Sequence, residues 1–480
     1  MADTIALMRK CVLDMAIRGE LVEQRPKEGT AEELISSFSE FNKKEARIHE
    51  KPFQIPKNWR WYSLQEIAEI IMGQSPPGTS VSTEKKGIEF HQGKINFSNM
   101  YLNESDKKTD QPKKIVGKDT LLLSVRAPVG NLNITSREIS IGRGLCGIKG
   151  KGEIDTKFLF YFLSTSKKEM EEKSTGTTFK AIAGNVIKAM LVPLPPLAEQ
   201  KRIVSKIEEI FAIIDQIGTR KAEALTIINN MRQTALQDAI MGVLVEQDET
   251  DEPASELYEK IKNEKEKLVK EKKIKKEKPL PEIEENETPF EIPESWKFMR
   301  LKEAVYNHGQ KKPDKTFSYI DIGSIDNKHT RLNAEEKIIE PEDAPSRARK
   351  IVKMGDILYS TVRPYLHNAC IIDREFSMEP IASTGFAVMR THSGILNRFL
   401  FHYLLSPTFD LFANDTANAK GTAYPAINDT KLYQAVIPLP PLNEQHRIVE
   451  KIDEIMAICD QMEAIFDGTS EANEALEIAE

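Results

Sequence analysis

Apolar residues follow a helical pattern in two matched segments of the chain. After Pro196 the spacing alternates between four and three, and the same spacing recurs after Pro441, from Ile448 to Phe466. Spacing of this kind is typical of a coiled-coil seam. Two matched copies favour an antiparallel coiled coil over a chance amphipathic pattern. The positions in the first copy and in an N-terminal segment of the same phase are Ile203, Ile207, Ile210, Ile214 and Ile217, then Ile5, Met8, Val12 and Met15.

The segments 52–195 and 289–440 differ in kind from the helices. Short apolar runs such as TLLLSV (120–125) and DILYSTV (356–362) are bounded by turn-forming sequences such as APVGN, which predicts strands. Helices are expected at 156–173 and 397–405. Both segments are therefore expected to be α+β domains, which we call domain 1 (52–195) and domain 2 (289–440).

The two domains belong to an internal duplication. PFQIPKNWRWYSL at Pro52 matches PFEIPESWKFMRL at Pro289, and VPLPPLAEQKRIVSKIEEI (192–210) matches IPLPPLNEQHRIVEKIDEI (437–455). A third element, MRKCVLDMAIRGELVEQ (8–24), matches MRQTALQDAIMGVLVEQ (231–247). That third element is out of order, but KFLFYFL (157–163) against RFLFHYL (398–404) completes three collinear matches with the first two, and these establish the repeat.

The order of these elements predicts how the repeats are assembled. Because the third element stands at the N-terminus and has no copy after the last helix, we expect circularly permuted repeats related by a pseudo-two-fold axis. The 5–24 segment would then complete the second repeat beside 442–466. The expected regions are an N-terminal helical segment (1–51), domain 1, a central helical region (196–247), a charged linker (248–288), domain 2 and a C-terminal helical region (441–480).

Composition narrows the class of protein. The chain has 480 residues, 40% of them hydrophobic, which suffices for packed cores. Its four cysteines include no CxxC pair, so neither a zinc ribbon nor a disulfide framework is supported. Neither a membrane span nor a signal peptide is predicted, and we expect a cytoplasmic protein.

The net charge of −7 is unevenly distributed. Domain 1 has 21 basic and 14 acidic residues, a balance of +7, whereas domain 2 has 19 and 18, a balance of +1. The acidic excess therefore belongs to the helices and linkers. Basic residues held in the domains are compatible with DNA binding, which depends on neutralising phosphates. Residues 259–278 have ten lysines and five acids, and a solvated helix is the favoured interpretation there.

Catalytic signatures are missing. There is no GxxxxGK[ST] loop for ATP, no HExxH and no histidine–cysteine cluster for a metal. PLPPL lacks the asparagine and the aromatic residue of an adenine-methylating motif. The duplicated Pro, Trp, Arg and Glu-Gln residues suit packing and helix capping better than chemistry.

With PLPPLAEQKRIVSKIEEI, its copy, the paired IPxxW segments, SVRAPVGN and STGTTF, the chain resembles the specificity subunit of type I restriction–modification systems. The resemblance implies two target recognition domains, each reading one half of a bipartite double-stranded DNA site in the major groove. It implies helices that space the domains and dock two methyltransferase subunits, and restriction–translocase subunits that join later. It also implies no catalysis or cofactor in this chain: S-adenosylmethionine belongs to the methyltransferase, and ATP and magnesium belong to the restriction subunit.

Candidate DNA contacts follow from the residue types that read bases. Arginine and lysine suit guanine, and asparagine and glutamine suit adenine. Arg126 and Arg363 occupy matched positions, so a phosphate contact or a role in the fold is favoured for them over base reading. The candidates are Gln74, Lys94, Asn96, Asn99, Arg126, Arg143 and Lys180 in domain 1, and Gln310, Lys311, Lys312, Arg347, Arg349, Arg363 and Lys420 in domain 2.

Two other classes of function stay open at this point. One is a protein-interaction scaffold that holds two partners without reading DNA, and the other is an enzyme fragment that has lost a fused methyltransferase. Trp59 and Trp296, which follow IPxxW in both copies, are expected to be core anchors rather than stacking platforms for bases.

Overall fold

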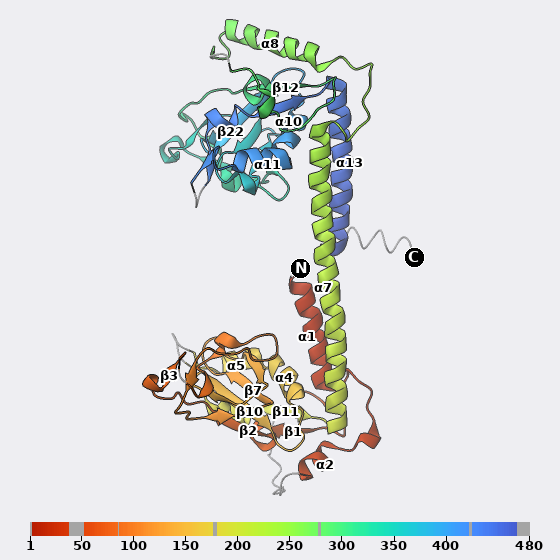
Figure 1. Cartoon of the computed structure of the whole chain (residues 1–480), viewed down its shortest axis with the longest axis vertical. Helices are drawn as coiled ribbons and strands as arrows, with labels where there is room; N and C mark the ends of the chain where they lie inside the picture. Colours follow the sequence, from red (N-terminus) through yellow and green to blue (C-terminus); the bar gives the residue numbers. More distant parts are fainter. Residues whose placement is uncertain are drawn as a thin grey trace. The chain divides into compact units, whose positions relative to one another are not determined.

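The computed structural model describes residues 2–37, 52–84, 86–175, 180–276, 280–421 and 425–467. The chain forms two compact units, unit 1 (Met1–Lys221) and unit 2 (Ala222–Glu480). Each unit combines a mixed domain with helices (Figure 1). The expected α+β class with two similar domains is confirmed.

Unit 1 has a central four-stranded sheet in the order β2-β10-β7-β8. Helix α4 packs on β7, β8 and β10, and its buried face includes Phe158, Leu159 and Phe162. The predicted strand at 120–125 is confirmed, and the single helix predicted at 156–173 is divided at Ser166 into α4 and α5. The elements of domain 1 are β1 (Arg60–Ser63), α3 (Leu64–Ile67), β2 (Ala68–Met72), β3 (Val81–Ser82), β4 (Ile88–His91), β5 (Lys108–Thr109), β6 (Ile115–Val116), β7 (Thr120–Ser124), β8 (Leu132–Thr135), β9 (Ile139–Ile141), β10 (Leu145–Gly150), α4 (Thr156–Thr165), α5 (Lys167–Glu172), α6 (Gly184–Ala189) and β11 (Leu191–Leu194).

Unit 2 repeats this plan with the sheet β13-β22-β19-β20. The strand and helix predicted at 356–362 and 397–405 are confirmed as β19 and α10. The elements are β12 (Lys297–Arg300), α9 (Leu301–Ala304), β13 (Val305–Tyr306), β14 (Phe317–Ile320), β15 (Ile325–Asp326), β16 (Arg331–Leu332), β17 (Lys337–Ile339), β18 (Ala348–Ile351), β19 (Ile357–Ser360), β20 (Ala369–Ile371), β21 (Glu379–Ser383), β22 (Phe386–Thr391), α10 (Asn397–Leu404), α11 (Pro407–Asn414), β23 (Ala419–Lys420), β24 (Ala426–Ile427), α12 (Asp429–Leu432) and β25 (Val436–Leu439).

Further helices lie outside the domains: α1 (Ala2–Arg18), α2 (Ala31–Ser36), α8 (Ala254–Lys270) and α13 (Leu442–Asp467). Helix α7 (Leu197–Met241) has 45 residues and continues through Gly218 without a break. The lysine-rich α8 is the helix expected in the linker, and Leu257 and Ile261 on one of its faces are buried. No helix of the described residues is long and apolar enough to cross a membrane.

The N-terminal helix packs within unit 1, which corrects the expected assembly. Arg9 on α1 makes an ion pair with Asp215 on α7, and the Gln24 side chain donates to Glu199 at 2.6 Å. The segment 5–24 therefore completes the first repeat and not the second. Each unit is built from consecutive sequence, so the repeat is direct and not circularly permuted.

Unit 2 reproduces these contacts at matched positions. Arg232 binds Asp460 at 2.6 Å, and Gln247 donates to Glu444. The second part of α7 thus takes, beside α13, the place that α1 takes in unit 1. In both units the contacts run antiparallel, because early residues of one helix meet late residues of its partner.

The duplicated glycine and tryptophan meet where each domain joins its helices. Gly19 and Gly242 both have φ of +74°, and an added Cβ would lie 2.5 Å from the ring carbon of Pro56 or Pro293. Trp59 and Trp296 lie directly behind these contacts, with 0% and 6% exposure. Both tryptophans are core anchors, as predicted.

The duplicated Glu-Gln pair fastens the same junction. The Gln200 amide donates to the Pro195 carbonyl at 2.9 Å and accepts from the Asp155 N–H at 3.0 Å. Gln445 does the same with Pro440 and with the Leu396 N–H. Both glutamine side chains are fully buried, so these residues hold the helix start to the domain.

Candidate nucleic-acid interface

Loops from four parts of domain 1 converge at one end of its central sheet. Strand β10 runs antiparallel to β2 and to β7, so its beginning lies beside their ends: Cys146 pairs with Met72 and Leu145 with Ser124. Strand β8 also begins at this end, where Leu132 pairs with Leu123. We call the segments 73–76, 125–131, 142–144 and 180–182 the loop edge of domain 1.

Backbone hydrogen bonds join these loops into one surface. The Val125 N–H donates to the Gly144 carbonyl at 3.0 Å, and the Ile182 N–H donates to the Val125 carbonyl at 3.0 Å. The matched bonds in domain 2 run from Thr361 to Gly385 and from Ile427 to Thr361. The loop edge of domain 2 comprises 361–368, 383–385, 419–421 and 425.

Four candidates of domain 1 gather on its loop edge: Gln74, Arg126, Arg143 and Lys180. Their side chains are exposed. Their backbone is fixed, because Gln74 N–H donates to the Ile141 carbonyl and Ala127 N–H donates to the Lys180 carbonyl. The last four residues of STGTTF, 176–179, lie outside the described residues.

Lys94, Asn96 and Asn99 lie on a different loop, which follows β4. The Asn96 amide donates to the Glu104 carbonyl at 2.8 Å, so this side chain braces its own loop. Lys94 and Asn99 are exposed. Lys94 borders a hollow of about 370 Å³ that also includes Asn131 from the loop edge and Lys167 from α5.

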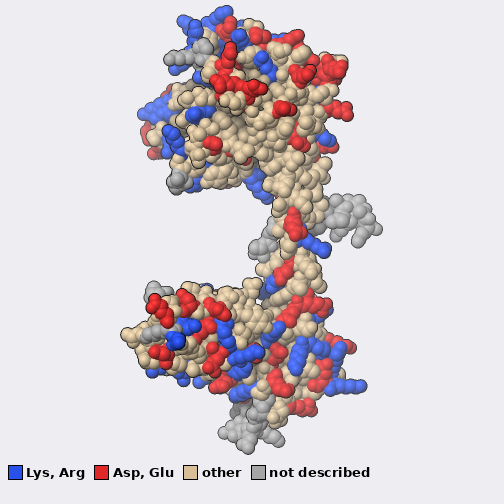
Figure 2. Space-filling view, viewed as in Figure 1, with Lys and Arg blue, Asp and Glu red and all other residues tan. Residues whose placement is uncertain are grey.

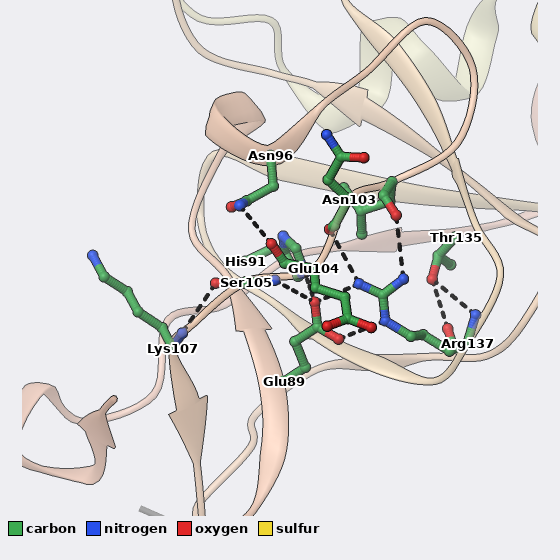
Figure 3. Close-up of polar contacts among 10 residues, drawn as sticks. Glu89, His91, Asn96, Asn103, Glu104, Ser105, Lys107, Thr135 and Arg137 are labelled. Atoms are coloured by element: carbon green, nitrogen blue, oxygen red, sulfur yellow. Dashed lines mark hydrogen bonds and ion pairs between the residues drawn. The ribbon is translucent and has the colours of Figure 1, made fainter. Parts of the chain in front are cut away.

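A partly buried ion pair holds the loop that carries these three candidates (Figure 3). Arg137 binds Glu89 through two hydrogen bonds of 2.6 Å and donates to the carbonyls of Leu102 and Asn103. The Ser105 N–H also donates to Glu89, at 2.7 Å. One carboxylate and one guanidinium therefore tie the far end of the loop to β4.

The charge state of this pair follows from its contacts. Burial raises the pKa of the Glu89 carboxyl, but the hydrogen bonds from Arg137, Ser105 and His91 outweigh burial and lower the pKa to about 2. Burial lowers the pKa of His91 below its usual value, although Glu89 opposes that shift. Glu89 is thus ionised at neutral pH.

Three candidates of domain 2 lie at its loop edge. Arg363 N–H donates to the Pro425 carbonyl at 2.7 Å, and the Arg347 carbonyl accepts from Thr384. Lys420 is exposed on β23, which pairs with β24. Arg363 thus takes the place of Ala127, whose N–H donates to the Lys180 carbonyl, while Arg126 bridges Ala181 as Val362 bridges Ala426. The two arginines matched in the sequence therefore do not occupy equivalent places in the fold.

The remaining candidates of domain 2, Gln310, Lys311, Lys312 and Arg349, lie in β18 or beside it. Lys311 N–H donates to the Arg349 carbonyl, and Gln310 forms a bridge with Lys350. The Lys311 ammonium pairs with Glu379 at 2.5 Å, and Arg349 donates to the Ala348 carbonyl. Lys312 is exposed beside them. Lys311 and Arg349 therefore already have protein partners.

Two polar residues of the candidate interface, Gln92 and Lys167, were not predicted from the sequence. Gln92 accepts a hydrogen bond from Ser75 at 2.8 Å, and its carbonyl accepts from Gly144, which places it at the loop edge. Lys167 donates to Asn131 at 3.0 Å. A glutamine following a strand was a usable signal for Gln92, but nothing in the sequence brought α5 next to the loop of Asn131.

The distribution of surface charge does not by itself identify a DNA-binding face. Figure 2 shows Lys and Arg interspersed with Asp and Glu on the visible face of each unit. No cluster of His, Cys, Asp and Glu able to hold a metal ion occurs among the described residues. The loop edges are thus distinguished by their convergent loops and exposed polar side chains.

Comparisons with known proteins agree with this architecture. Residues 56–226 and 293–465 match the type I restriction modification DNA specificity domain. The type I restriction enzyme EcoAI specificity subunit of Escherichia coli is 26% identical, covering 96% of this chain and 90% of its own length. The EcoEI specificity subunit of the same species is 24% identical over the same shares.

A solved structure, the HsdS subunit from Thermoanaerobacter tengcongensis, is 26% identical over 45% of this chain and 49% of its own, with a TM-score of 0.31. The family match covers both domains together with the helices that follow them. The chain therefore belongs to the family of type I restriction–modification specificity subunits, and is a DNA-recognition subunit and not an enzyme.

Proposed function

We propose that the chain reads a bipartite double-stranded DNA site, with one half-site per domain, and recruits two methyltransferase subunits. Restriction–translocase subunits would join the same complex. S-adenosylmethionine would be bound by the methyltransferase, and ATP and magnesium by the restriction subunit. The observation that carries the proposal is the repeated loop edge, with exposed basic or amide side chains on a fixed backbone in both domains.

Physical reasoning supports the loop edges as the reading surfaces. Base edges in the major groove are read by side chains held in a fixed register, while basic residues beside them neutralise phosphate. Arg126, Arg143 and Lys180 supply such charges in domain 1, and Arg347, Arg363 and Lys420 supply them in domain 2. Because the residues of the two edges differ, the two half-sites should differ in sequence.

The helices support docking of two copies of one partner. Met8 on α1 and Ile213 on α7 are 40% and 49% exposed, and their matched residues Met231 and Ile458 are 38% and 44% exposed. Exposed apolar side chains at repeat-related positions mark an interaction surface that occurs twice. The same helices would form antiparallel coiled coils that space the domains.

Exchange of one domain tests the proposal. Replacing 289–437 with the equivalent segment of a related subunit, and co-expressing the chimera with the methyltransferase, should change one half of the methylated motif only. Genome-wide mapping of methyladenine measures this. Partner binding without sequence-specific DNA binding, measured by fluorescence anisotropy on mixed duplexes, would instead support a scaffold without DNA reading.

A further inference from the structure

The loop between β19 and β20 is held in an unusual conformation at the loop edge of domain 2. It contains a short 3-10 helix, Pro364–Leu366, flanked by Arg363 and His367, and both flanking residues have φ of +49°. Residues other than glycine rarely adopt this left-handed conformation, and when they do the surroundings impose it.

Contacts from several other elements impose the conformation here. They reach both ends of the loop and its tip, so they fix the position of the tip relative to the rest of domain 2. These contacts are Arg363 N–H to the Pro425 carbonyl (2.7 Å), Tyr365 N–H to Asn414 Oδ1 (3.2 Å), the His367 ring to Asp410 (2.7 Å) and the Asn327 amide to the Leu366 carbonyl (3.0 Å).

The fixed tip presents two large apolar side chains to solvent. Tyr365 is 50% exposed and Leu366 is 36% exposed. Lys420, which is exposed, lies nearby, because its strand pairs with β24 and Ala426 of β24 forms a bridge with Val362. A rigid, strained loop carrying exposed apolar groups beside a cation suits a ligand that is apolar at one point and anionic around it.

DNA offers that combination in the major groove. The C5-methyl group of thymine is the apolar feature of the base edges there, and phosphates flank it. We propose that Tyr365 and Leu366 contact the methyl group of a thymine in the half-site of domain 2. This inference rests on the proposed function.

The matched loop of domain 1 does not present exposed apolar side chains in this way. The Ala127 N–H donates to the Lys180 carbonyl as the Arg363 N–H donates to the Pro425 carbonyl, so Pro128 takes the place of Pro364 and Val129 takes that of Tyr365. Val129 is buried at 2% exposure, and the domain 1 loop is one residue shorter, with Gly130 before Asn131 where domain 2 has Leu366 and His367 before Asn368. The thymine contact is therefore specific to one half-site, which gives the experiment an internal comparison.

The test removes the methyl group from the DNA. The full chain with its methyltransferase is titrated with duplexes in which each thymine of the motif is replaced in turn by deoxyuridine. Loss of one buried methyl group should weaken binding by about fourfold at one position in the half-site of domain 2, since such a group is worth about 0.8 kcal/mol. Tyr365→Ala combined with Leu366→Ala should bind the thymine and deoxyuridine duplexes equally.

Two controls separate contact from folding. Tyr365→Phe keeps the ring and should keep the methyl sensitivity. Met354→Ala removes another exposed apolar residue of domain 2, 59% exposed and preceding β19, and should also keep it. Thermal unfolding confirms that each variant is folded.

The wild-type titration alone can overturn the inference. Specific binding that is insensitive to every thymine methyl in that half-site, or a half-site without thymine, would refute the contact and leave the proposed function intact. Absence of any sequence-specific binding by the wild-type complex would refute the proposed function itself.

Discussion

At the scale of single residues, the loop that carries Lys94, Asn96 and Asn99 depends on one ion pair. Glu89 has a side-chain exposure of 14%, and Arg137 forms two hydrogen bonds to it. Removing one member of a partly buried ion pair is destabilising, because the other member is left without its charge partner. Glu89 and Arg137 therefore position the loop that carries these three candidate DNA contacts.

This pair predicts a stability change in acid. The folded-state pKa of Glu89 lies below the ordinary value of 4.5, so its stabilisation is present at neutral pH and is lost as pH falls from about 4.5 towards 2. Glu89→Gln should cost about 2 kcal/mol at pH 7 and much less near pH 2. Urea unfolding at both pH values measures the difference.

Glu138→Gln provides the matched control, since it removes an exposed carboxylate next to Arg137. Its unfolding free energy should stay within about 0.5 kcal/mol of the wild type at both pH values. Equal losses in Glu89→Gln at pH 7 and at pH 2 would contradict the assigned charge interaction.

At the scale of elements, the Glu-Gln pair at the start of each long helix fixes the helix to its domain. Gln200 satisfies a carbonyl at the end of β11 and an N–H at the start of α4 with one fully buried amide. Unpaired buried backbone groups are costly, so the side chain cannot be shortened without loss. The same geometry in the second repeat makes Gln445 the equivalent residue.

Gln200→Ala should therefore destabilise unit 1 by about 2–4 kcal/mol, since it leaves two backbone groups without partners. Chemical denaturation followed by circular dichroism measures the change. Gln216→Ala, on the exposed face of the same helix, should have almost no effect. If both variants unfolded alike, the junction contacts would not stabilise the unit.

The positions of helices and strands were predictable from the sequence, but which helix packs beside which was not. The run TLLLSV forms β7 because its apolar residues are buried on both faces of the sheet, and the heptad spacing correctly predicted long helices. The partner of 5–24 was predicted wrongly, because α1, α7 and α13 share one heptad phase and phase alone cannot select among them. In the structure the pairing found is accompanied by polar contacts such as Arg9–Asp215, and Arg232–Asp460 repeats this contact in unit 2.

The candidate site was predictable only in residue type. Lys311 and Arg349 have the chemistry of base readers but are held by Glu379 and by a carbonyl, and the sequence does not show such pairing. Tyr365 was not among the predicted candidates, because nothing in the sequence distinguishes this loop tyrosine from others. Only the structure shows that the loop holds its side chain exposed to solvent.

At the scale of the whole molecule, α7 joins two helix pairs that are separate along the sequence. Ile5 of α1 lies near Gly218 of α7, and Cys459 of α13 donates to the Ile228 carbonyl of α7. Between these points α7 is helical, and Ala222 and Glu223 are exposed. An insertion there would leave the Arg9–Asp215 and Arg232–Asp460 ion pairs in place, since each lies wholly on one side of it. Because α1 pairs with the first part of α7, no compensating insertion between residues 5 and 24 is needed.

This arrangement leads to a prediction about the spacer between half-sites. Seven residues of helix-forming sequence inserted at Ala222 keep the heptad phase and lengthen α7 by about 10 Å, at 1.5 Å per residue. At 3.4 Å per base pair along each strand this corresponds to about three base pairs. If α7 fixes the distance between the domains, the methylated motif should keep both half-sites and gain about three unread positions. Methyladenine mapping in cells that express the variant with its methyltransferase gives the motif directly.

A matched variant with seven residues inserted in the 248–253 linker should keep the original spacer, because it does not lengthen α7. An active α7 variant whose motif keeps its original spacer would show that the methyltransferase subunits set the distance and that the helices serve only for docking.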